Sequence, residues 1–190
     1  LGALFALVAS GLWIVNSFYS IGYMRGNRER NQTRFYICFA IAIFGALGVA
    51  MSGNLFTLFV FYEVLTLSTY PLVAHKGDAA AKRGARIYLL TLLGTSIGLF
   101  LTALMWTWTL AGQNLDFVQG GLLSGLNISP AVSTALLLLF VFGIGKAALM
   151  PVHFWLPNAM VAPTPVSALL HAVAVVKAGV FTVMKVSIFI

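Results

Sequence analysis

Long apolar segments alternate with short polar ones along the whole chain of 190 residues. A helix needs about 20 predominantly apolar residues to cross the hydrocarbon core of a bilayer. Strands of an outer-membrane barrel would be about 10 residues long and would alternate in polarity. The pattern therefore predicts an all-α, polytopic membrane protein with about six transmembrane helices. The predicted spans are residues 1–24, 35–51, 55–74, 87–111, 131–150 and 165–190.

Composition agrees with this class, because 61% of the residues are hydrophobic and only 8% are charged. Such a chain has too little polar surface to cover a water-soluble particle. A net charge of +7 would suggest nucleic acid as the partner of a soluble protein. Here the lipid bilayer is the expected environment and no nucleic-acid partner is expected. The single cysteine, Cys38, lies in an apolar segment and is interpreted as a packing residue.

Two short basic segments, residues 25–34 and 75–86, predict the orientation in the membrane. Two helices separate these segments, so both must lie on the same side. The positive-inside rule makes that side cytoplasmic. The turn at 52–54 and the loop at 114–130 contain no basic residue and are expected to face outward. The basic residues of the two predicted cytoplasmic loops are Arg25, Arg28, Arg30, Arg34, Lys76, Lys82, Arg83 and Arg86.

Four charged residues lie inside predicted spans, and three of them, Glu63, Lys146 and Lys177, are the principal candidates for a function. A charge at the centre of a membrane helix costs about 2.5–3.5 kcal/mol on insertion scales. Glu63 lies about 12 Å along its helix and Lys177 about 18 Å along its own, at a rise of 1.5 Å per residue. Both positions are close to the bilayer centre, and we therefore predict that these residues line a proton or ion pathway. The alternative is a buried Glu63–Lys177 ion pair that holds helices together.

His171 is a further candidate for the same pathway, and Lys185 and His153 are secondary candidates. His171 precedes Lys177 by six residues and would lie about 120° from it on a regular helix, so only water could connect them. A packing role for His171 is an equal alternative. Lys185 is expected to extend to the outer interface. His153 has no cysteine or carboxylate at ligand spacing, so no metal site is predicted. Tyr62 is interpreted as a packing residue.

The stretch Lys146–Pro157 is expected to interrupt the fifth predicted helix. Proline lacks the N–H that a helix needs, and the breaking residues are Gly143, Gly145, Pro151 and Pro157. A lysine just before such a break is typical of the discontinuous helices of transporters. The alternative is an ordinary helix that ends at Met150, followed by a cytoplasmic loop. No pattern for a catalytic site or a bound cofactor is present.

Five motifs resemble the antiporter-like membrane subunits of respiratory complex I and of Mrp-type sodium/proton antiporters. They are Asn54–Glu63, Gly145–Pro151, His153–Met160, Ala162–His171 and Val176–Gly179. The resemblance implies that the chain is part of a larger inverted-repeat transporter. Residues 1–24 would precede the first repeat, and residues 35–190 would form that five-helix, proton-translocating repeat.

The resemblance also implies a function. The chain would be a proton-translocating subunit of a multisubunit cation/proton antiporter in a bacterial inner membrane, moving protons in exchange for sodium beside other membrane subunits. Glu63 would act on Lys146 at the helix break, with Lys177 and His171 in the same pathway. One alternative is a proton-pumping subunit of complex I or of a membrane-bound hydrogenase, where any enzymatic activity is quinone-dependent and lies in other subunits. Another is a structural subunit that transports nothing.

Overall fold

The computed structural model describes residues 1–190, and these residues form an almost entirely helical protein. The first three helices are α1 (Gly2–Gly26), α2 (Gln32–Met51) and α3 (Leu55–Val73). The fourth helical stretch is continuous and consists of α4 (Ala79–Thr95), a π-turn (Ser96–Phe100) and α5 (Leu101–Leu110). A half-length helix, α6 (Pro130–Gly143), follows. The all-α expectation is confirmed. Five stretches are long and apolar enough to cross a membrane, and α6 is a shorter apolar helix.

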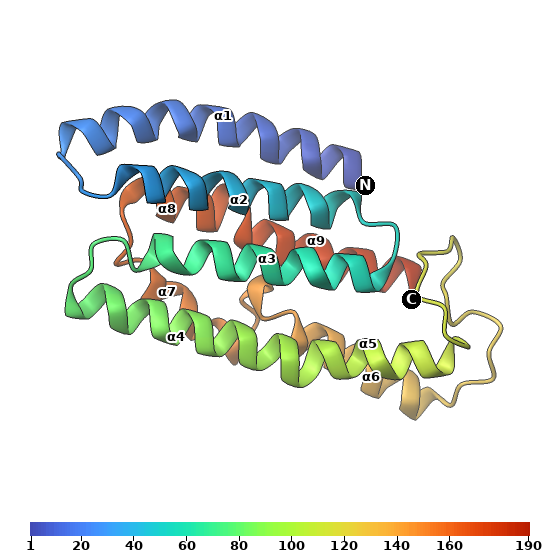
Figure 1. The fold of residues 1–190 in the computed structure, drawn as a ribbon. Helices are drawn as coiled ribbons and strands as arrows, with labels where there is room; N and C mark the ends of the chain where they lie inside the picture. The colour runs from blue at the N-terminus through green and yellow to red at the C-terminus, as the bar shows by residue number, and fades with distance from the viewer.

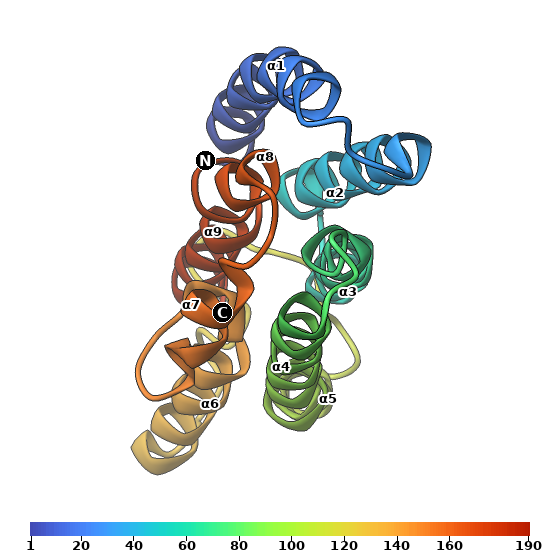
Figure 2. The same cartoon turned by 90° about the vertical axis from the view of Figure 1, so that its left-hand side faces the viewer.

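The helices lie side by side in two layers (Figures 1 and 2). One layer contains α2, α3 and the α4–α5 stretch. The other contains α6, α7 (Trp155–Ala159), α8 (Thr164–Ala168) and α9 (Val175–Phe189). Helix α1 lies along one edge of the bundle, where it packs against α2 and α8. The irregular parts of the second layer therefore face the regular helices of the first.

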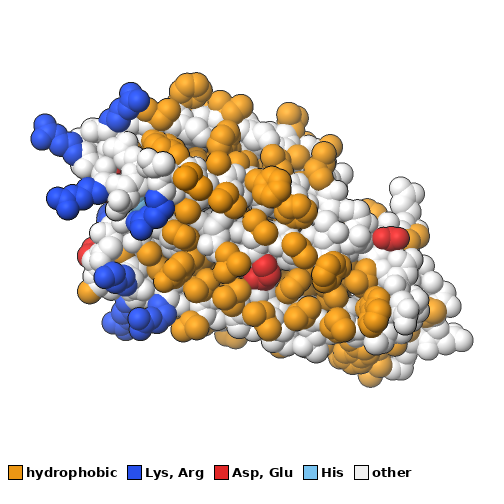
Figure 3. Space-filling view, in the orientation of Figure 1, with side chains coloured by type: hydrophobic (Ala, Val, Ile, Leu, Met, Phe, Trp, Pro, Cys, Tyr) orange, Lys and Arg blue, Asp and Glu red, His pale blue; other side chains and the backbone are white.

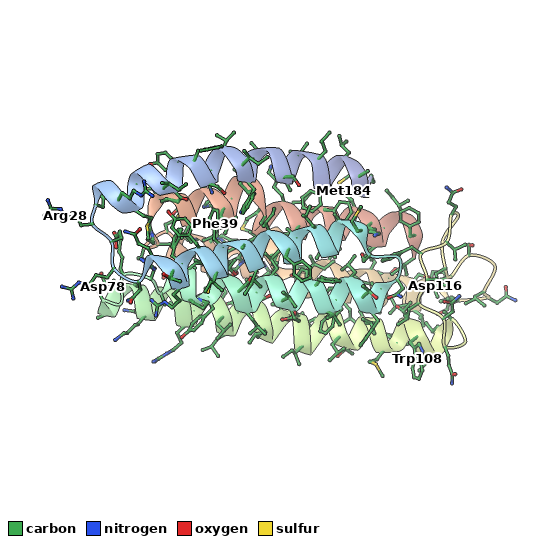
Figure 4. All side chains as sticks on the ribbon, turned by 45° about the horizontal axis from the view of Figure 1, so that its top comes forward. Arg28, Phe39, Asp78, Trp108, Asp116 and Met184 are labelled. Atoms are coloured by element: carbon green, nitrogen blue, oxygen red, sulfur yellow. The ribbon has the colours of Figure 1, made fainter.

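Both basic segments lie at the same end of the bundle, as the sequence predicts. Figure 3 shows the lysine and arginine side chains gathered at that end, and apolar side chains cover most of the remaining face. Figure 4 places Arg28 and Asp78 there, whereas Trp108 and Asp116 lie at the opposite end. This separation of charge is the one that the positive-inside rule requires.

The second basic segment is mostly helical, which corrects the expectation of a loop over residues 75–86. Helix α4 begins at Ala79, because the Asp78 side chain accepts a hydrogen bond from the Ala81 N–H at 2.6 Å. An aspartate at this position and the alanines that follow it both favour a helix start. The fourth span therefore extends over Ala79–Leu110 rather than 87–111. Its first turns carry three basic residues, Lys82, Arg83 and Arg86.

The fifth predicted span is interrupted, and the alternative of a regular helix to Met150 is wrong. Helix α6 ends at Gly143, and a 3-10 turn over Gly145–Ala147 follows it. The Met150–Pro151 peptide bond is cis, and a second 3-10 turn (Val152–Phe154) leads into α7. Lys146 therefore lies within the break rather than just before it, because the helix ends at the glycines and not at the first proline.

Small residues allow neighbouring helices to pack closely against the break. A Cβ atom on Gly145 would collide with the Thr95 side chain of α4. A Cβ atom on Gly179 of α9 would collide with the backbone of Ala147. Close approach of backbones at small residues is a common way to pack membrane helices. The break is thus held from both sides in the interior of the bundle.

The sixth predicted span is also irregular. It consists of α8, a π-turn over Leu169–Val173, and α9. Ala174 between them has φ −124° and ψ −67°, outside the α-helical region. The relation between His171 and Lys177 expected for a regular helix therefore does not hold here.

Candidate functional site

Lys146 is the centre of the candidate site, and its side chain is completely buried. The Nζ atom donates to the Tyr62 carbonyl oxygen at 2.5 Å and to Thr66 Oγ1 at 2.7 Å. It also lies 3.1 Å from the centroid of the Tyr62 ring. The break in the second layer and the regular helix α3 in the first layer thus meet at one lysine.

This environment can hold Lys146 in either protonation state. A neutral amine has two N–H donors, and the two acceptors satisfy both of them. An ammonium has three, and its third N–H can face the Tyr62 ring, whose π-face attracts a cation. No acidic side chain lies within ion-pair distance of Lys146, since the only carboxylate that contacts a basic side chain is Glu29, beside His75. The site can therefore gain or lose a proton without a change of hydrogen-bond partners.

Aromatic side chains fix the geometry around the lysine. The Tyr62 hydroxyl accepts a hydrogen bond from the Lys146 backbone N–H at 3.1 Å. The buried Trp155 of α7 donates from Nε1 to the Gly145 carbonyl oxygen at 3.0 Å, and its ring packs edge-on against Tyr88 at 5.4 Å. Backbone groups that the broken helix leaves without partners are costly in a membrane. Tyr62 satisfies one of them beside the lysine, and Trp155 adds a second hydrogen bond to the Gly145 carbonyl, which also accepts from the Ala148 N–H.

Glu63 lies on α3 next to Tyr62 but does not contact the lysine directly. Consecutive residues of a helix point about 100° apart, so Tyr62 faces the break and Glu63 does not. Both carboxyl oxygens of Glu63 are buried and have no hydrogen-bond partner. The structure therefore brings Glu63 and Lys146 into one region without an ion pair. Glu63 also forms no ion pair with Lys177, so the alternative of a Glu63–Lys177 lock has no contact to support it.

Lys177 points away from Lys146. It is exposed on α9 and lines a shallow apolar groove of about 230 Å³ between α9 and α1. Gly179 of the same helix packs on the Lys146–Ala147 backbone. Two residues along a helix correspond to a rotation of about 200°, which places Lys177 on the opposite face. Within this chain Lys177 and Lys146 are not neighbours.

The two histidines lie in irregular segments of the second layer. His171 is half-buried in the π-turn over Leu169–Val173, and its Nε2 atom lies 3.1 Å from the Met160 sulfur. His153 is exposed in the 3-10 turn that precedes α7. Neither histidine hydrogen-bonds to Lys146.

Lys185 reaches the turn at 52–54, which is expected to face outward, but it is buried there rather than exposed to solvent. Its Nζ atom donates to the Ser52 carbonyl oxygen at 2.5 Å and to Ser52 Oγ at 3.2 Å. Ser52 is the C-terminal cap of α2. The last carbonyl groups of a helix have no partner within it. Lys185 donates a hydrogen bond to one of these groups, the Ser52 carbonyl.

The residues that sequence reasoning missed are the uncharged partners of Lys146. Tyr62 was expected only to pack, but it both packs and hydrogen-bonds to the lysine. Thr66 lies one turn after Tyr62 on the same face of α3, and its hydroxyl also donates to the Tyr62 carbonyl at 3.2 Å. The only sequence signal for this pair is that Thr66, with its hydroxyl group, follows Tyr62 by one helical turn within an apolar span.

A layer of regular helices, a half-length helix and a break that holds a buried lysine define a polytopic membrane protein with a discontinuous helix. The family model described as "NADH:quinone oxidoreductase/Mrp antiporter, TM" matches residues 52–190. The chain belongs to this family.

Similar proteins come from both branches of the family. The chain is 34% identical over 193 residues to a "Na(+)/H(+) antiporter subunit A1" of Staphylococcus haemolyticus, covering 98% of this chain and 23% of that protein. It is 33% identical over 193 residues to an "NAD(P)H-quinone oxidoreductase chain 5" of Synechocystis, covering 97% of this chain and 28% of that protein. The chain thus spans about a quarter of these relatives.

A solved structure shares the fold. The Mrp complex from Dietzia sp. DQ12-45-1b superposes with a TM-score of 0.85 at 28% identity, over 95% of this chain and 20% of that chain. The arrangement of regular and broken helices described above is therefore an arrangement that an Mrp complex contains.

Proposed function

We propose that this chain is a proton-translocating repeat of a multisubunit monovalent cation/proton antiporter. The observation that carries the proposal is Lys146, a completely buried lysine at a helix break with two uncharged acceptors and no ion pair. A lysine at this depth is expensive and is expected to have a function. The similarity to an antiporter subunit A1 supports the choice of transport over a purely structural role.

In the proposed mechanism Lys146 accepts and releases a proton that crosses the membrane. Glu63 lies one residue beyond the lysine's acceptor on α3, and its unpartnered carboxylate acts on Lys146 through its charge. An opposite charge nearby favours the ammonium, and burial favours the neutral amine. A change in the distance or the protonation of Glu63 would therefore shift the lysine between its two states.

Lys177 and His171 have a different place in this proposal. Lys177 lies on the face of α9 opposite Lys146 and lines the groove beside α1, and His171 lies in the π-turn without a contact to Lys146. We propose that they receive the proton from outside this repeat, through water or through a neighbouring element of the complete protein. His153 is exposed in the turn that precedes α7, and we propose that it acts only where protons enter the pathway. The cation, which we propose to be sodium, would cross elsewhere in the complex.

The proposed setting is a bacterial inner membrane, beside other membrane subunits. The basic end would face the cytoplasm, as the positive-inside rule requires. Cysteines introduced at Gly26 and Gly77 should then react with an impermeant maleimide only from the cytoplasm, and a cysteine at Gly120 only from outside. Labelling of positions 26 and 120 from the same side would contradict this orientation.

A test of the transport proposal uses the complete complex reconstituted in vesicles. Sodium pulses without any redox substrate should move protons, and Lys146→Ala should abolish this movement while the complex still assembles. Thr134→Ala, on the exposed surface of α6, is a matched control that should leave the rate unchanged. Persistent exchange in Lys146→Ala would show that the lysine carries no proton and would favour a structural role.

A second candidate function is proton pumping in a respiratory complex. The quinone oxidoreductase relative favours it, since its similarity to this chain is almost the same as that of the antiporter subunit. In that case a quinone and its reductant, rather than a sodium pulse, would drive the proton movement. The same vesicles distinguish the two functions directly.

A further inference from the structure

A polar pocket of about 640 Å³ lies at the end of the bundle where the lysine and arginine side chains gather (Figure 3). Its walls are the α1–α2 loop, the first turn of α2, the end of α3 and the first turns of α4. Glu29 is its only acidic residue. The basic residues that line it are Arg28, Arg30, Arg34, Lys76, Lys82 and Arg86.

The positive charge of this pocket is not compensated within the chain. The Glu29 carboxylate lies 3.8 Å from His75 Nε2, and no lysine or arginine side chain lies within ion-pair distance of it. Asp78, the other acid of this end, uses its carboxylate to cap α4. The arginine and lysine side chains of the pocket therefore have no carboxylate partner, and together they produce a field that attracts an anion.

A buried histidine lies in the same pocket without a hydrogen-bond partner. His75 is only 7% exposed, and neither ring nitrogen is hydrogen-bonded. Its ring packs edge-on against Phe35 at 5.3 Å. Buried polar groups almost always have a partner. A neutral imidazole carries one N–H donor, so this ring can donate to an oxygen of a ligand that enters the pocket.

The pocket continues into the apolar surface of the bundle. On α2, Arg34 lines the pocket and Ile37, one turn deeper, is more than half exposed. On α4, Arg86 lines the pocket and Leu90, one turn deeper, is more than half exposed. Residues three or four apart share a helix face. Helices α2 and α4 thus each place a guanidinium at the pocket and an exposed aliphatic side chain one turn further toward the middle of the bundle.

From this juxtaposition we infer that the pocket binds the phosphate group of an anionic glycerophospholipid whose acyl chains lie along α2 and α4. Arginine binds phosphate oxygens in a bidentate geometry. Basic pockets between transmembrane helices on the cytoplasmic side are suited to anionic lipid headgroups. A soluble phosphate compound would use the same charges but would gain nothing from Ile37 and Leu90. This difference favours the lipid.

The test measures binding of fluorescent phosphatidylglycerol to the detergent-solubilised complete complex. Unlabelled phosphatidylglycerol, phosphatidylcholine and inorganic phosphate serve as competitors. The pocket variant is Arg34→Gln/Arg86→Gln. The matched control is Arg25→Gln/Arg83→Gln, which removes the same charge from the same end of the bundle but outside the pocket.

The site predicts roughly 30-fold weaker binding for the pocket variant, from the usual contribution of two basic side chains to anionic-lipid affinity. The control should stay within about threefold of the parental complex, since charges outside the pocket act only through screened solvent. Phosphatidylglycerol should compete, and phosphatidylcholine should compete poorly. Arg34→Lys/Arg86→Lys keeps the charge and should retain most of the binding, which guards against misfolding of the glutamine variant.

Three results would overturn the inference. Equal losses in the pocket and control variants would mean general electrostatic attraction rather than a site. Competition by inorganic phosphate as effective as that by phosphatidylglycerol would assign the pocket to a soluble phosphate. No binding to the parental complex would mean that another part of the assembly fills the pocket.

Discussion

Two buried lysines, Lys146 and Lys185, have nearly the same chemical environment and different structural roles. Each donates from Nζ to one backbone carbonyl and one hydroxyl: Lys146 to Tyr62 and Thr66, and Lys185 to both groups of Ser52. Each also lies near an aromatic ring. Neither forms an ion pair. Composition and local contacts alone would not tell them apart.

The position of the acceptor separates them. Ser52 ends α2, where carbonyl groups have no helical partner, so Lys185 completes a structure that would otherwise lack a hydrogen bond. Tyr62 lies in the interior of α3, where its carbonyl group has the partner that a regular helix supplies. The fold therefore gains from Lys185 but does not require Lys146. An expensive residue that the fold does not require is a residue retained for its chemistry.

The largest expected effect concerns the coupling of Glu63 and Lys146. Lys146→Met should stop proton movement in the reconstituted complex, and Glu63→Gln should slow it strongly, because the lysine loses the charge that acts on it. The double variant should be no worse than Lys146→Met alone, since interacting sites share one coupling free energy. A double-mutant cycle on thermal stability measures this coupling, and the transport rate of Glu63→Gln alone measures the loss of the charge. Additive stability losses would show that the two residues act separately.

The next effect concerns the hydroxyl acceptor. Thr66→Val keeps the size of the side chain and leaves one N–H of Lys146 without a partner, at a cost of about 1–3 kcal/mol for a buried group. The complex should denature at a lower temperature and transport more slowly. Thr66→Ser restores the hydroxyl and should recover both properties. Thr134→Val is the matched surface control. If Thr66→Val transports protons at the parental rate, the Thr66 hydroxyl has no role in transport.

A smaller effect is expected at the other lysine. Lys185→Met leaves the end of α2 without its donor and should destabilise the complex by about 1 kcal/mol, the usual net contribution of one hydrogen bond. Thermal denaturation of the purified complex measures this. Lys185→Arg, which keeps a donor, should lose less. An unchanged denaturation temperature in Lys185→Met would refute the capping role.

The smallest effect is a pH dependence at the basic end. Burial, opposed by Glu29 and assisted by Arg34, lowers the pKa of His75 below its ordinary value of 6.5. The folded state therefore favours the neutral ring, and its stability is complete above pH 6.5 and declines as the pH falls below that value. The complex should be less heat-stable at pH 5.5 than at pH 8, and His75→Gln should reduce this difference. A larger difference in the variant would mean that the pKa is raised instead.

Much of the fold could be predicted because the membrane imposes it. Apolar length predicted the spans, and basic residues predicted which end of the bundle they share. Two span bounds were wrong because local rules compete with hydropathy. Asp78 starts α4 among polar residues, and α6 ends at Gly143, which was expected to weaken the helix, rather than at residue 150.

Only the charged residues of the site could be predicted from the sequence. Glu63 and Lys146 stand out because charge is rare in an apolar span, whereas Tyr62 and Thr66 are ordinary residues of membrane helices. The directions of Lys177 and Lys185 depended on packing across the bundle, which hydropathy does not contain. A π-turn and a break at Ala174 also changed the relation of His171 to Lys177.

The most direct test of the central claim compares proton flux through the complete complex carrying Lys146→Met with flux through the complex carrying Lys185→Met. Both changes remove one buried amino group and nearly keep the length of the side chain, and flux is normalised to the amount of assembled complex. We expect no flux in the first variant and near-parental flux in the second. Comparable flux in the two variants, whether retained or lost, would contradict the division between a lysine that carries protons and a lysine that caps a helix.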